Sequence, residues 1–487
     1  MYSKSKRYFE IWWQGIKSLP QKTSIHGFRF IADPKRHWIE RLFWLIFVAM
    51  SWYGSILLII AQYRAFQNSP ISFVVETTYK DWNTQFPSIA VCEQDNSVRI
   101  GAVSDGLWGS DHDFNMEEVL KEIAFFKGVT YYVSEVCQGE DSAEECFKSN
   151  LTYYANLVRS DCNDVMANCS WNQKSFDCCR YFRPVETEIG PCFIINTIQG
   201  GEEVPILKMH SNRATGPGRI QFDVMLPVSV YVLNEEDVPS LSYLGSEIMN
   251  VGLETHYRRY ITVKNIENDA TARMITPEKR RCRYSDENNL QVYPYYSYSA
   301  CTVQCRKDAQ MRLCNCSNFF MPNTPEDEKC DLNGIICLND KVNHLSVLRA
   351  RWSNHPGLFC DCLPSCTEAE LTIVKDFIKP TGLNYATVEI QLSVLPSERY
   401  RRNVVRGVLD LVVSTGGTGG LFLGVSILSV LELLYTLLLR PFFDIYSQRN
   451  EDPWHKKYGN RRIEDSKFKF KKNTNKLIMK KRLKQKM

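Results

Sequence analysis

The residues best suited to chemistry lie in one apolar stretch near the C-terminus. Residues 407–439 are uncharged except for two carboxylates, Asp410 and Glu432. A carboxylate inside a membrane segment is costly, so it indicates a functional site, here a path for cations. Hydroxyl side chains accompany the two acids at helical spacing, and they are Ser414, Thr418, Ser426 and Ser429. The opposing interpretation places Asp410 at the outer membrane interface and pairs Glu432 with a basic residue of a neighbouring helix.

Three glycines in the same stretch, Gly416, Gly420 and Gly424, stand four residues apart on one helical face. Such a stripe allows close packing of helices. It also allows the helix to unwind, so that backbone carbonyls face an aqueous path. The polar neighbours favour the second interpretation. Because one helix cannot enclose a pore, conduction would require an oligomer with a cyclic axis.

Two segments could position these residues in a membrane. Residues 42–63 are 22 uncharged residues between Arg41 and Arg64, which fits the roughly 20 residues needed to cross a bilayer. As a straight helix the 33 residues of 407–439 would measure about 50 Å against a hydrocarbon core of about 30 Å. The second segment must therefore tilt, project or break.

The charges flanking these segments predict the topology. Residues 1–41 carry nine basic and three acidic side chains, and residues 440–487 carry sixteen and five. The positive-inside rule then places both termini in the cytoplasm. The basic tail would anchor this topology and contact anionic lipids of the inner leaflet. A role in nucleic-acid binding is disfavoured because the basic run is juxtamembrane.

The 18 cysteines all lie between Cys92 and Cys366, in the loop between the two segments. An even number confined to one region predicts a disulfide framework formed outside the cytoplasm. Structural zinc is disfavoured because the chain has no CxxC pair, and we expect neither a metal nor a cofactor. Glycosylation sequons at Asn150, Asn168 and Asn315 fall in the same loop. The sequence alone leaves the disulfide connectivity open.

Four segments, in this order, resemble the degenerin/epithelial sodium channel family, and in particular its insect pickpocket branch. They are the His-Gly pair His26-Gly27 within Ser24–Arg29, Phe86-Pro-Ser-Ile-Ala-Val-Cys92, the cysteine-rich stretch Tyr296–Cys366, and Leu421–Glu432 with its Gly-x-Ser triplet. Each motif is weak alone, but their order and spacing around two membrane segments make the resemblance specific. Residues 100–270 match the family in general character.

The resemblance implies a trimeric plasma-membrane channel with two transmembrane helices and a large disulfide-rich α+β ectodomain. The chain would be a subunit of a sodium-selective, amiloride-sensitive type of channel gated through this ectodomain, and it would not be an enzyme. The expected segments are a cytoplasmic segment (1–41), the first transmembrane helix (42–63), the extracellular domain (64–403), the second transmembrane helix (404–439) and a basic cytoplasmic tail (440–487).

The resemblance also implies roles for single residues. The selectivity filter would be formed by Gly424, Val425 and Ser426. The pore would be lined by Asp410, Ser414, Thr418, Ser429 and Glu432. Gating would involve His26, Gly27 and Val413.

The family pattern further implies five disulfides: Cys282–Cys366, Cys301–Cys362, Cys305–Cys360, Cys314–Cys337 and Cys316–Cys330. The family pattern assigns no partners to the remaining eight cysteines, so their pairing stays open.

Two residues depart from the family pattern, and both are bulkier than usual. Val425 occupies the middle of the filter, so sodium-over-potassium selectivity is less secure than channel identity. Val413 stands where family members usually carry a small residue, which raises the prospect of unusual resting activity. The gating stimulus and the choice between homomeric and heteromeric assembly are not encoded in any recognisable motif.

A different class also fits the gross topology. A scavenger-receptor-like protein that binds and transfers lipid has two membrane spans and a disulfide-bonded ectodomain. It predicts an uninterrupted second span without an acid, and so explains neither the glycines nor Glu432.

Overall fold

The computed structural model describes residues 25–68, 71–77, 82–138, 146–201, 206–440 and 443. It contains two compact units, which we treat separately. The helical unit comprises residues 1–69 and 406–487, and the disulfide-bonded unit comprises residues 70–405.

The helical unit is built around helix α3 (Trp38–Asn68), which is longer than the predicted span of 42–63 at both ends. Within the described residues, α3 is the helix that is long and apolar enough to cross a membrane by itself. Helix α14 (Val408–Leu423) and the stretch Ile427–Leu439 reach that length only when counted together, and they are bent by 73° at the break between them. The stretch consists of α15 (Ile427–Leu434) and a wider π-helical turn, Tyr435–Leu439.

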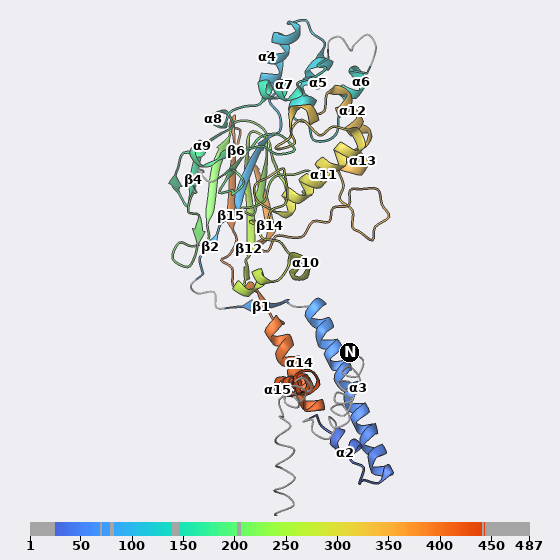
Figure 1. Ribbon diagram of the computed structural model, residues 1–487. Helices are drawn as coiled ribbons and strands as arrows, with labels where there is room; N and C mark the ends of the chain where they lie inside the picture. Colours follow the sequence, from blue (N-terminus) through green and yellow to red (C-terminus); the bar gives the residue numbers. More distant parts are fainter. Residues whose placement is uncertain are drawn as a thin grey trace, which may run out of the picture. The chain divides into compact units, whose positions relative to one another are not determined.

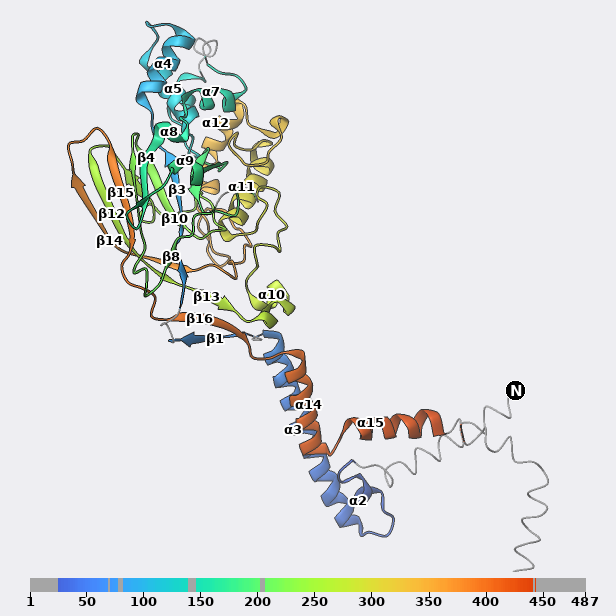
Figure 2. The same ribbon diagram turned by 90° about the vertical axis from the view of Figure 1, so that its left-hand side faces the viewer.

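Helix α14 starts four residues later than predicted, because Val404 still belongs to a β-strand and Gly407 caps the helix. It lies beside α3, and a short helix, α2 (Phe28–Ala32), packs against the other end of α3 (Figure 2). Aromatic side chains make the contact between α2 and α3, where Phe30 stacks on Trp44 with the ring centres 4.5 Å apart.

Four sheets form the disulfide-bonded unit (Figure 1). The six-stranded sheet has the order β14 (Glu370–Pro380), β12 (Thr255–Lys264), β15 (Ala386–Leu392), β9 (Arg219–Val224), β4 (Met166–Trp171) and β5 (Lys174–Ser175). The five-stranded sheet has the order β11 (Met249–Val251), β10 (Val228–Leu233), β3 (Ser88–Glu93), β7 (Cys192–Ile195) and β6 (Arg183–Val185). The smaller sheets are β1 (Ile71–Glu76), β16 (Arg399–Val404) and β13 (Ile266–Asn268), and the pair β2 (Thr84–Gln85) and β8 (His210–Ser211).

Strand β3 lies at the centre of the core, and all six of its residues are buried. Because successive side chains of a strand point to opposite faces, Ile89 and Val91 pack towards the six-stranded sheet. Ala90 and Cys92 belong to a second apolar cluster that includes Ala300 of the long helix α11. The five-stranded sheet is therefore covered on both faces, which explains why β3 reads as a continuous apolar run.

Helices gather around α11 (Tyr298–Cys314) and at the end of the unit beyond it (Figures 1 and 2). The other helices of the unit are α4 (Ser97–Trp108), α5 (Phe114–Ala124), α6 (Tyr132–Val136), α7 (Leu151–Val158), α8 (Cys162–Val165), α9 (Cys178–Tyr181), α10 (Pro277–Arg280), α12 (Leu332–Asp340) and α13 (Val342–Leu345). Two short 3₁₀ helices, Ala270–Met274 and Glu326–Glu328, lie in the connections between the described elements. One apolar cluster joins α4, α5 and α7 to α12, so these helices form a common layer.

All 18 cysteines are paired in nine disulfides. Five bonds are the pairs that the family resemblance implies: Cys282–Cys366, Cys301–Cys362, Cys305–Cys360, Cys314–Cys337 and Cys316–Cys330. The four remaining bonds are Cys92–Cys192, Cys137–Cys146, Cys162–Cys179 and Cys169–Cys178. Four of the bonds hold α11 and the residues that follow it, so this helix is covalently tied to its surroundings at several points.

A buried ion pair fixes α11 to the five-stranded sheet. Arg306 of α11 and Glu188 of the β6–β7 turn are in direct contact, and their side chains are 1% and 0% exposed. The Leu241 amide donates to Glu188 at 2.7 Å, and Arg306 Nε donates to the Leu345 carbonyl at 2.9 Å. Each charge therefore has several partners, as a buried charge requires.

We predict that Arg306→Leu lowers the free energy of unfolding of the full-length protein by about 3–5 kcal/mol, because it leaves the Glu188 carboxylate buried without a counter-charge. Denaturant unfolding of the purified chain measures this loss. The matched control is Arg99→Leu, which removes an exposed pair 4.0 Å from Asp164 and should cost at most about 1 kcal/mol. Equal losses in the two variants would contradict the assigned role.

Several carboxylates crowd together where the loop after β10 meets the segment leading into β14. Ser365 and Thr367 hydroxyls donate to Glu236 at 2.6 and 2.8 Å, and the Ser299 hydroxyl donates to Asp237 at 2.7 Å. Burial, with added repulsion from Asp237 and Glu236, raises the pKa of Glu368 to about 7. Burial raises the pKa of Asp237 as well.

This cluster should make the protein more stable in mild acid. The folded state holds a proton on Glu368 with a pKa of about 7, whereas an unfolded glutamate releases it near 4.5. The stabilisation is therefore complete below the unfolded pKa and is lost as the pH rises through 7. We expect the free energy of unfolding of the full-length protein, measured by thermal unfolding, to fall by about 1–3 kcal/mol between pH 5 and pH 8. Glu368→Gln should flatten this dependence, and an unchanged pH profile in that variant would contradict the assignment.

Candidate functional site

The helical unit contains a break at the predicted glycine-serine triplet. Helix α14 ends at Leu423, and Gly424 takes a left-handed conformation with φ +66°. Glycine reaches this conformation without steric cost and commonly terminates helices. The Gly424 amide donates to the Gly420 carbonyl at 3.0 Å, and the Val425 amide donates to the Gly419 carbonyl at 3.2 Å. Helical geometry therefore stops at the last glycine of the stripe.

Ser426 starts the next helix by a reciprocal cap. Its hydroxyl accepts the Ser429 amide at 3.1 Å, and its own amide donates to the Ser429 hydroxyl at 3.3 Å. Both bonds satisfy backbone or side-chain groups that a helix start leaves without partners. Two of the predicted pore residues thus act together in positioning α15.

His26 and Gly27 lie directly against this break. The His26 amide donates to the Leu423 carbonyl at 3.0 Å. A methyl group placed on Gly424 would stand 2.6 Å from the His26 ring, so the imidazole occupies the space that glycine leaves open. Gly27 has φ +83°, and a methyl group there would meet Val48 of α3 at 2.3 Å. The predicted filter and the predicted gating pair therefore form one contact site.

The last carbonyls of α14 have partners on other segments. The Ser51 hydroxyl of α3 donates to the Phe422 carbonyl at 2.7 Å, and the His26 amide donates to the Leu423 carbonyl. A cavity of about 280 Å³ lies beside this contact, lined mainly by aromatic side chains that include Trp44 and Trp52. The freed backbone of the break is thus held by α3 and by the segment that precedes it.

The polar residues of α14 do not all share one environment. The Asp410 carboxylate accepts the Gly407 amide at 2.9 Å and so caps the helix start. Thr418 is 8% exposed; its hydroxyl donates to the Ser414 carbonyl at 2.9 Å and accepts from Gln62 of α3 at 3.1 Å. Ser414 itself is exposed. Thr418 therefore joins α14 to α3, whereas Asp410 and Ser414 face outwards from this chain.

The glycine face of α14 is open in the single chain. A methyl group on Gly416, Gly417 or Gly419 would meet nothing within 4 Å among the described residues. Val413 and Glu432 are exposed, and Val425 is half-buried. Gly416, Gly417 and Gly419 therefore do not pack against α3, whereas Gly424 of the stripe is covered by His26.

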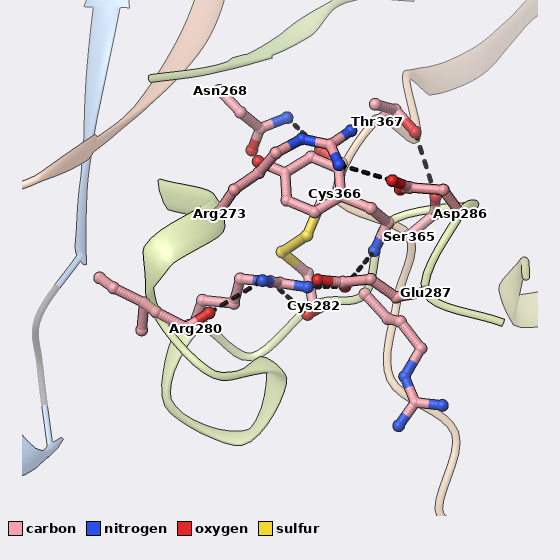
Figure 3. Close-up of polar contacts among 12 residues, drawn as sticks. Asn268, Arg273, Arg280, Cys282, Asp286, Glu287, Ser365, Cys366 and Thr367 are labelled. Atoms are coloured by element: carbon pink, nitrogen blue, oxygen red, sulfur yellow. Dashed lines mark hydrogen bonds and ion pairs between the residues drawn. A yellow bond between two sulfur atoms is a disulfide. The ribbon is translucent and has the colours of Figure 1, made fainter. Parts of the chain in front are cut away.

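In the disulfide-bonded unit, the bond between Cys282 and Cys366 lies in a cluster of arginines (Figure 3). Arg402 of β16 donates to the Cys366 carbonyl at 3.1 Å and to Asn268 at 2.8 Å, and its Nη1 lies 2.8 Å from the Cys282 sulfur. Burial lowers the pKa of Arg402. Around this bond, Figure 3 shows Arg273 paired with Asp286 and Arg280 paired with Glu287.

Strand β16 connects this cluster to α14 along the chain. It pairs antiparallel with β1, with Ile71 opposite Val404. Arg399 and Arg401 both bind Glu76 of β1, at 2.8 and 3.2 Å, and the hydrogen bonds from these guanidinium groups lower the pKa of Glu76. Three residues separate β16 from α14, so the sheet holds the strands that lead to both long helices.

All three sequon asparagines are exposed, and all have positive φ angles. Asn150 begins α7 and Asn315 ends α11. Asn168 differs because its amide nitrogen donates to Asp223 at 2.9 Å.

Sequence reasoning missed the partners of the break. Ser51, which bonds the Phe422 carbonyl, and Gln62, which bonds Thr418, lie in an apolar helix with no motif around them. Arg402, which contacts the Cys282–Cys366 bond, is one of several arginines in β16.

Ser24 and almost all of the basic tail, from 441 onwards apart from Phe443, lie outside the described residues. Among the residues that are described, no group of three or more His, Cys, Asp or Glu side chains is arranged to hold a metal ion.

Comparison with known proteins identifies the family. Residues 19–436 match the family model described as amiloride-sensitive sodium channel. The chain is 21% identical to the sodium channel protein Nach of Drosophila melanogaster over 89% of both chains, and 24% identical to pickpocket protein 28 of that species over 87% of this chain and 78% of the relative. It is 25% identical to acid-sensing ion channel 2 of Mus musculus over 63% of each chain. The comparisons give no support to the scavenger-receptor alternative. The chain belongs to the amiloride-sensitive sodium channel family and is a cation-channel subunit.

Proposed function

We propose that three copies of this chain, alone or with related subunits, enclose a sodium path whose narrowest part is Gly424–Ser426. The observation that carries the proposal is the helix break, where a left-handed glycine is followed by a capped serine. Unwound backbone at membrane depth is tolerated where it is buried in protein or lines an aqueous cavity. The carbonyls of Gly424 and Val425 and the Ser426 hydroxyl would replace water around the ion, because those of Phe422 and Leu423 are bonded to Ser51 and His26.

The open face of α14 supports an oligomeric path. Asp410 and Ser414 would line its outer part, while Ser429 and Glu432 would line its inner part. We assign Thr418 to packing between α14 and α3 because its hydroxyl is bonded to Gln62. The half-buried Val425 would set the apolar width of the filter, and therefore the degree of sodium preference.

We further propose that the second long segment crosses the membrane as a broken span, so that both termini are cytoplasmic. The disulfide-bonded unit would then act as a stiff extracellular lever. A stimulus can open the channel only by binding or stabilising the open shape of this unit more than the closed one. Sugars would be carried at Asn150 and Asn315, whereas the Asn168 amide is engaged by Asp223. We also propose that the basic tail, residues 440–487, binds anionic lipids of the inner leaflet.

The pore assignment is tested by recording currents from cells that express Ser426→Cys. A positively charged methanethiosulfonate reagent should abolish most of the sodium current, because the modified side chain would stand in the ion path. The same recordings, with sodium exchanged for potassium and with amiloride added, measure selectivity and block.

Leu57→Cys is the matched control, because Leu57 is an exposed apolar residue of α3 rather than of the break. Its current should survive the reagent. Loss of current in both variants, or in neither, would contradict the placement of Ser426 in the path. If the chain carries no current when expressed alone, the same variants are recorded after expression together with a related subunit.

A second prediction concerns the contact between His26 and Gly424. Gly424→Ala should shift the balance between open and closed channels by about 1–2 kcal/mol, or roughly five- to thirtyfold. The reason is that the new methyl group meets the imidazole at 2.6 Å and alanine disfavours φ +66°. Open probability in single-channel recordings measures the shift.

Gly416→Ala is the control, since nothing lies within 4 Å of a methyl group there. Adding His26→Ala to Gly424→Ala should restore part of the original balance, because it removes the clash but not the backbone strain. Equal effects of the two glycine variants, or strict additivity of the two substitutions at the contact, would show that the contact does not influence gating.

A further inference from the structure

The loop that follows α13, residues 347–358, displays a tryptophan to solvent. Trp352 is 87% exposed, so its side chain makes almost no contact with the rest of the chain. Figure 1 shows the chain leaving α13 as a loop that projects away from α11. Tryptophan and arginine are enriched among the residues that contribute most to binding, because each covers a large area and also offers hydrogen bonds. An uncovered tryptophan therefore directs attention to its neighbours in this segment, which we call the Trp352 loop.

The base of the Trp352 loop is fixed to the helical layer. Leu348 and Leu358 form a β-bridge, and the Leu358 amide donates to the Val347 carbonyl at 2.8 Å. Leu358 is 7% exposed and packs in the apolar cluster of α4, α5, α7 and α12. A methyl group on Gly357 would stand 2.8 Å from the Val347 carbonyl oxygen, so glycine is needed for the two ends of the loop to lie this close. The loop is therefore closed at its base.

The tip of the loop is a turn. The Ser353 amide donates to the Ala350 carbonyl at 3.0 Å, which places Trp352 at the third of the four turn positions. The His355 amide donates to the Ser353 hydroxyl at 3.3 Å and continues the ordered backbone beyond the turn. Trp352 is thus presented by a turn of defined shape, which reduces the entropy that a partner must remove on binding.

Two arginines accompany Trp352, and their charges are not neutralised. Arg349 Nη1 donates to the Ser353 carbonyl at 3.3 Å. The Arg351 guanidinium lies over the Phe359 ring, 5.8 Å from the ring centre. Both partners are uncharged, and in the part of the chain that the structure describes neither guanidinium forms an ion pair. The loop therefore holds two positioned cations beside its tryptophan.

This local charge is opposite to that of the unit that carries it. Residues 70–405 contain 45 acidic and 32 basic side chains. Residues 341–360 contain Lys341, Arg349 and Arg351 and no acidic residue. An anionic partner is therefore attracted to the Trp352 loop and repelled by most of the remaining surface, which gives the contact a preferred place.

The partner must offer an apolar face as well as anions. A sugar ring of an anionic polysaccharide presents a flat face of C–H bonds, with its charged groups at the edge of the ring. An indole can stack on that face while neighbouring guanidinium groups bind the anions through paired hydrogen bonds. An acidic peptide carries its carboxylates on flexible side chains and offers no such face. The combination of Trp352 with two arginines therefore favours the polysaccharide.

We propose that the Trp352 loop binds a sulfated polysaccharide of the cell surface or the extracellular matrix. Trp352 stacks on a sugar ring, and Arg349 and Arg351 bind sulfate groups on either side of it. The proposal rests on the extracellular position proposed above for the disulfide-bonded unit, and it is independent of the pore residues.

The test measures binding of fluorescent heparin to intact cells that express the full-length chain, together with a related subunit where the chain does not reach the surface alone. The cells' own sulfated polysaccharides are first removed enzymatically, and impermeant biotin measures the amount of chain at the surface. Intact cells are required because the basic tail, residues 440–487, would itself attract heparin in a solubilised sample. Binding should be saturable. Hyaluronan, which carries carboxylates and no sulfates, should compete at least about tenfold more weakly.

Trp352→Ala should weaken heparin binding about five- to tenfold, because it removes the stacking contact and leaves every charge in place. Tyr131→Ala is the matched control, since Tyr131 is a 63% exposed aromatic residue at the start of α6, outside the loop. Its heparin binding should equal that of the unchanged chain. Binding that survives Trp352→Ala overturns the proposal.

Replacing both arginines, Arg349→Gln with Arg351→Gln, should weaken heparin binding about tenfold or more. The matched control removes the same charge from exposed positions outside the loop, Lys208→Gln with Arg213→Gln, and should leave binding unchanged. Equal losses in the two double variants, or no binding above that of cells without the chain, overturn the proposal. Polyglutamate that competes as well as heparin at equal charge also overturns it, because the loop would then recognise an acidic protein.

Discussion

The structure of the helical unit depends on one constraint: a helix that breaks must find partners for the backbone groups it frees. Several groups at this break have one. Gly424 turns the chain, Ser426 and Ser429 cap each other, and the carbonyls of Phe422 and Leu423 accept bonds from Ser51 and His26. The His-Gly segment is therefore part of the break itself. A movement of that segment would exchange these bonds for others, and this exchange is the physical basis of the proposed link between the His-Gly segment and gating.

In the disulfide-bonded unit, rigidity comes from covalent and buried ionic links at the same helix. Four disulfides hold α11 and its neighbours, and the Arg306–Glu188 pair fastens α11 to the five-stranded sheet. The fifth bond of this region, Cys282–Cys366, contacts Arg402 of β16, and β16 leads to α14 within three residues. The disulfides, the buried ion pair and the Arg402 contact therefore form a series of fixed links between α11 and the strand that continues along the chain into the broken segment. The half-buried Arg399–Glu76 pair, with side chains 23% and 22% exposed, joins β16 to β1 beside these links.

The sequence predicted the parts of this architecture that depend on local composition. Uncharged runs marked the long helices, and glycine followed by Gly-x-Ser marked a break. Glycine spacing alone could not select the break among three equally spaced glycines, and the family resemblance was needed to place it at Gly424–Ser426. Gly416 and Gly420 stay helical, whereas Gly424 precedes a serine able to cap a new helix, so the cap decides the position. Contacts between distant segments left no periodic signal: Arg306 and Glu188 are 118 residues apart, and Gln62 and Thr418 are 356 apart. Asp410 and Thr418 share a spacing, yet one caps a helix and the other packs against α3, because the neighbouring helix determines each environment.

The helical unit exposes two kinds of surface. Its long helices expose rows of large apolar residues, as lipid-facing helices do, but α14 also exposes a face of glycines with Ser414 beside them. Small residues on a helix face gain nothing from lipid contact, since their value is to let another backbone or water approach closely. Helix α3 does not use that face, because it meets α14 through Thr418 and Phe422 instead. The open surface at Gly416, Gly417 and Gly419, the outward carboxylate of Asp410 and the broken helix are the features on which the proposed oligomeric path rests.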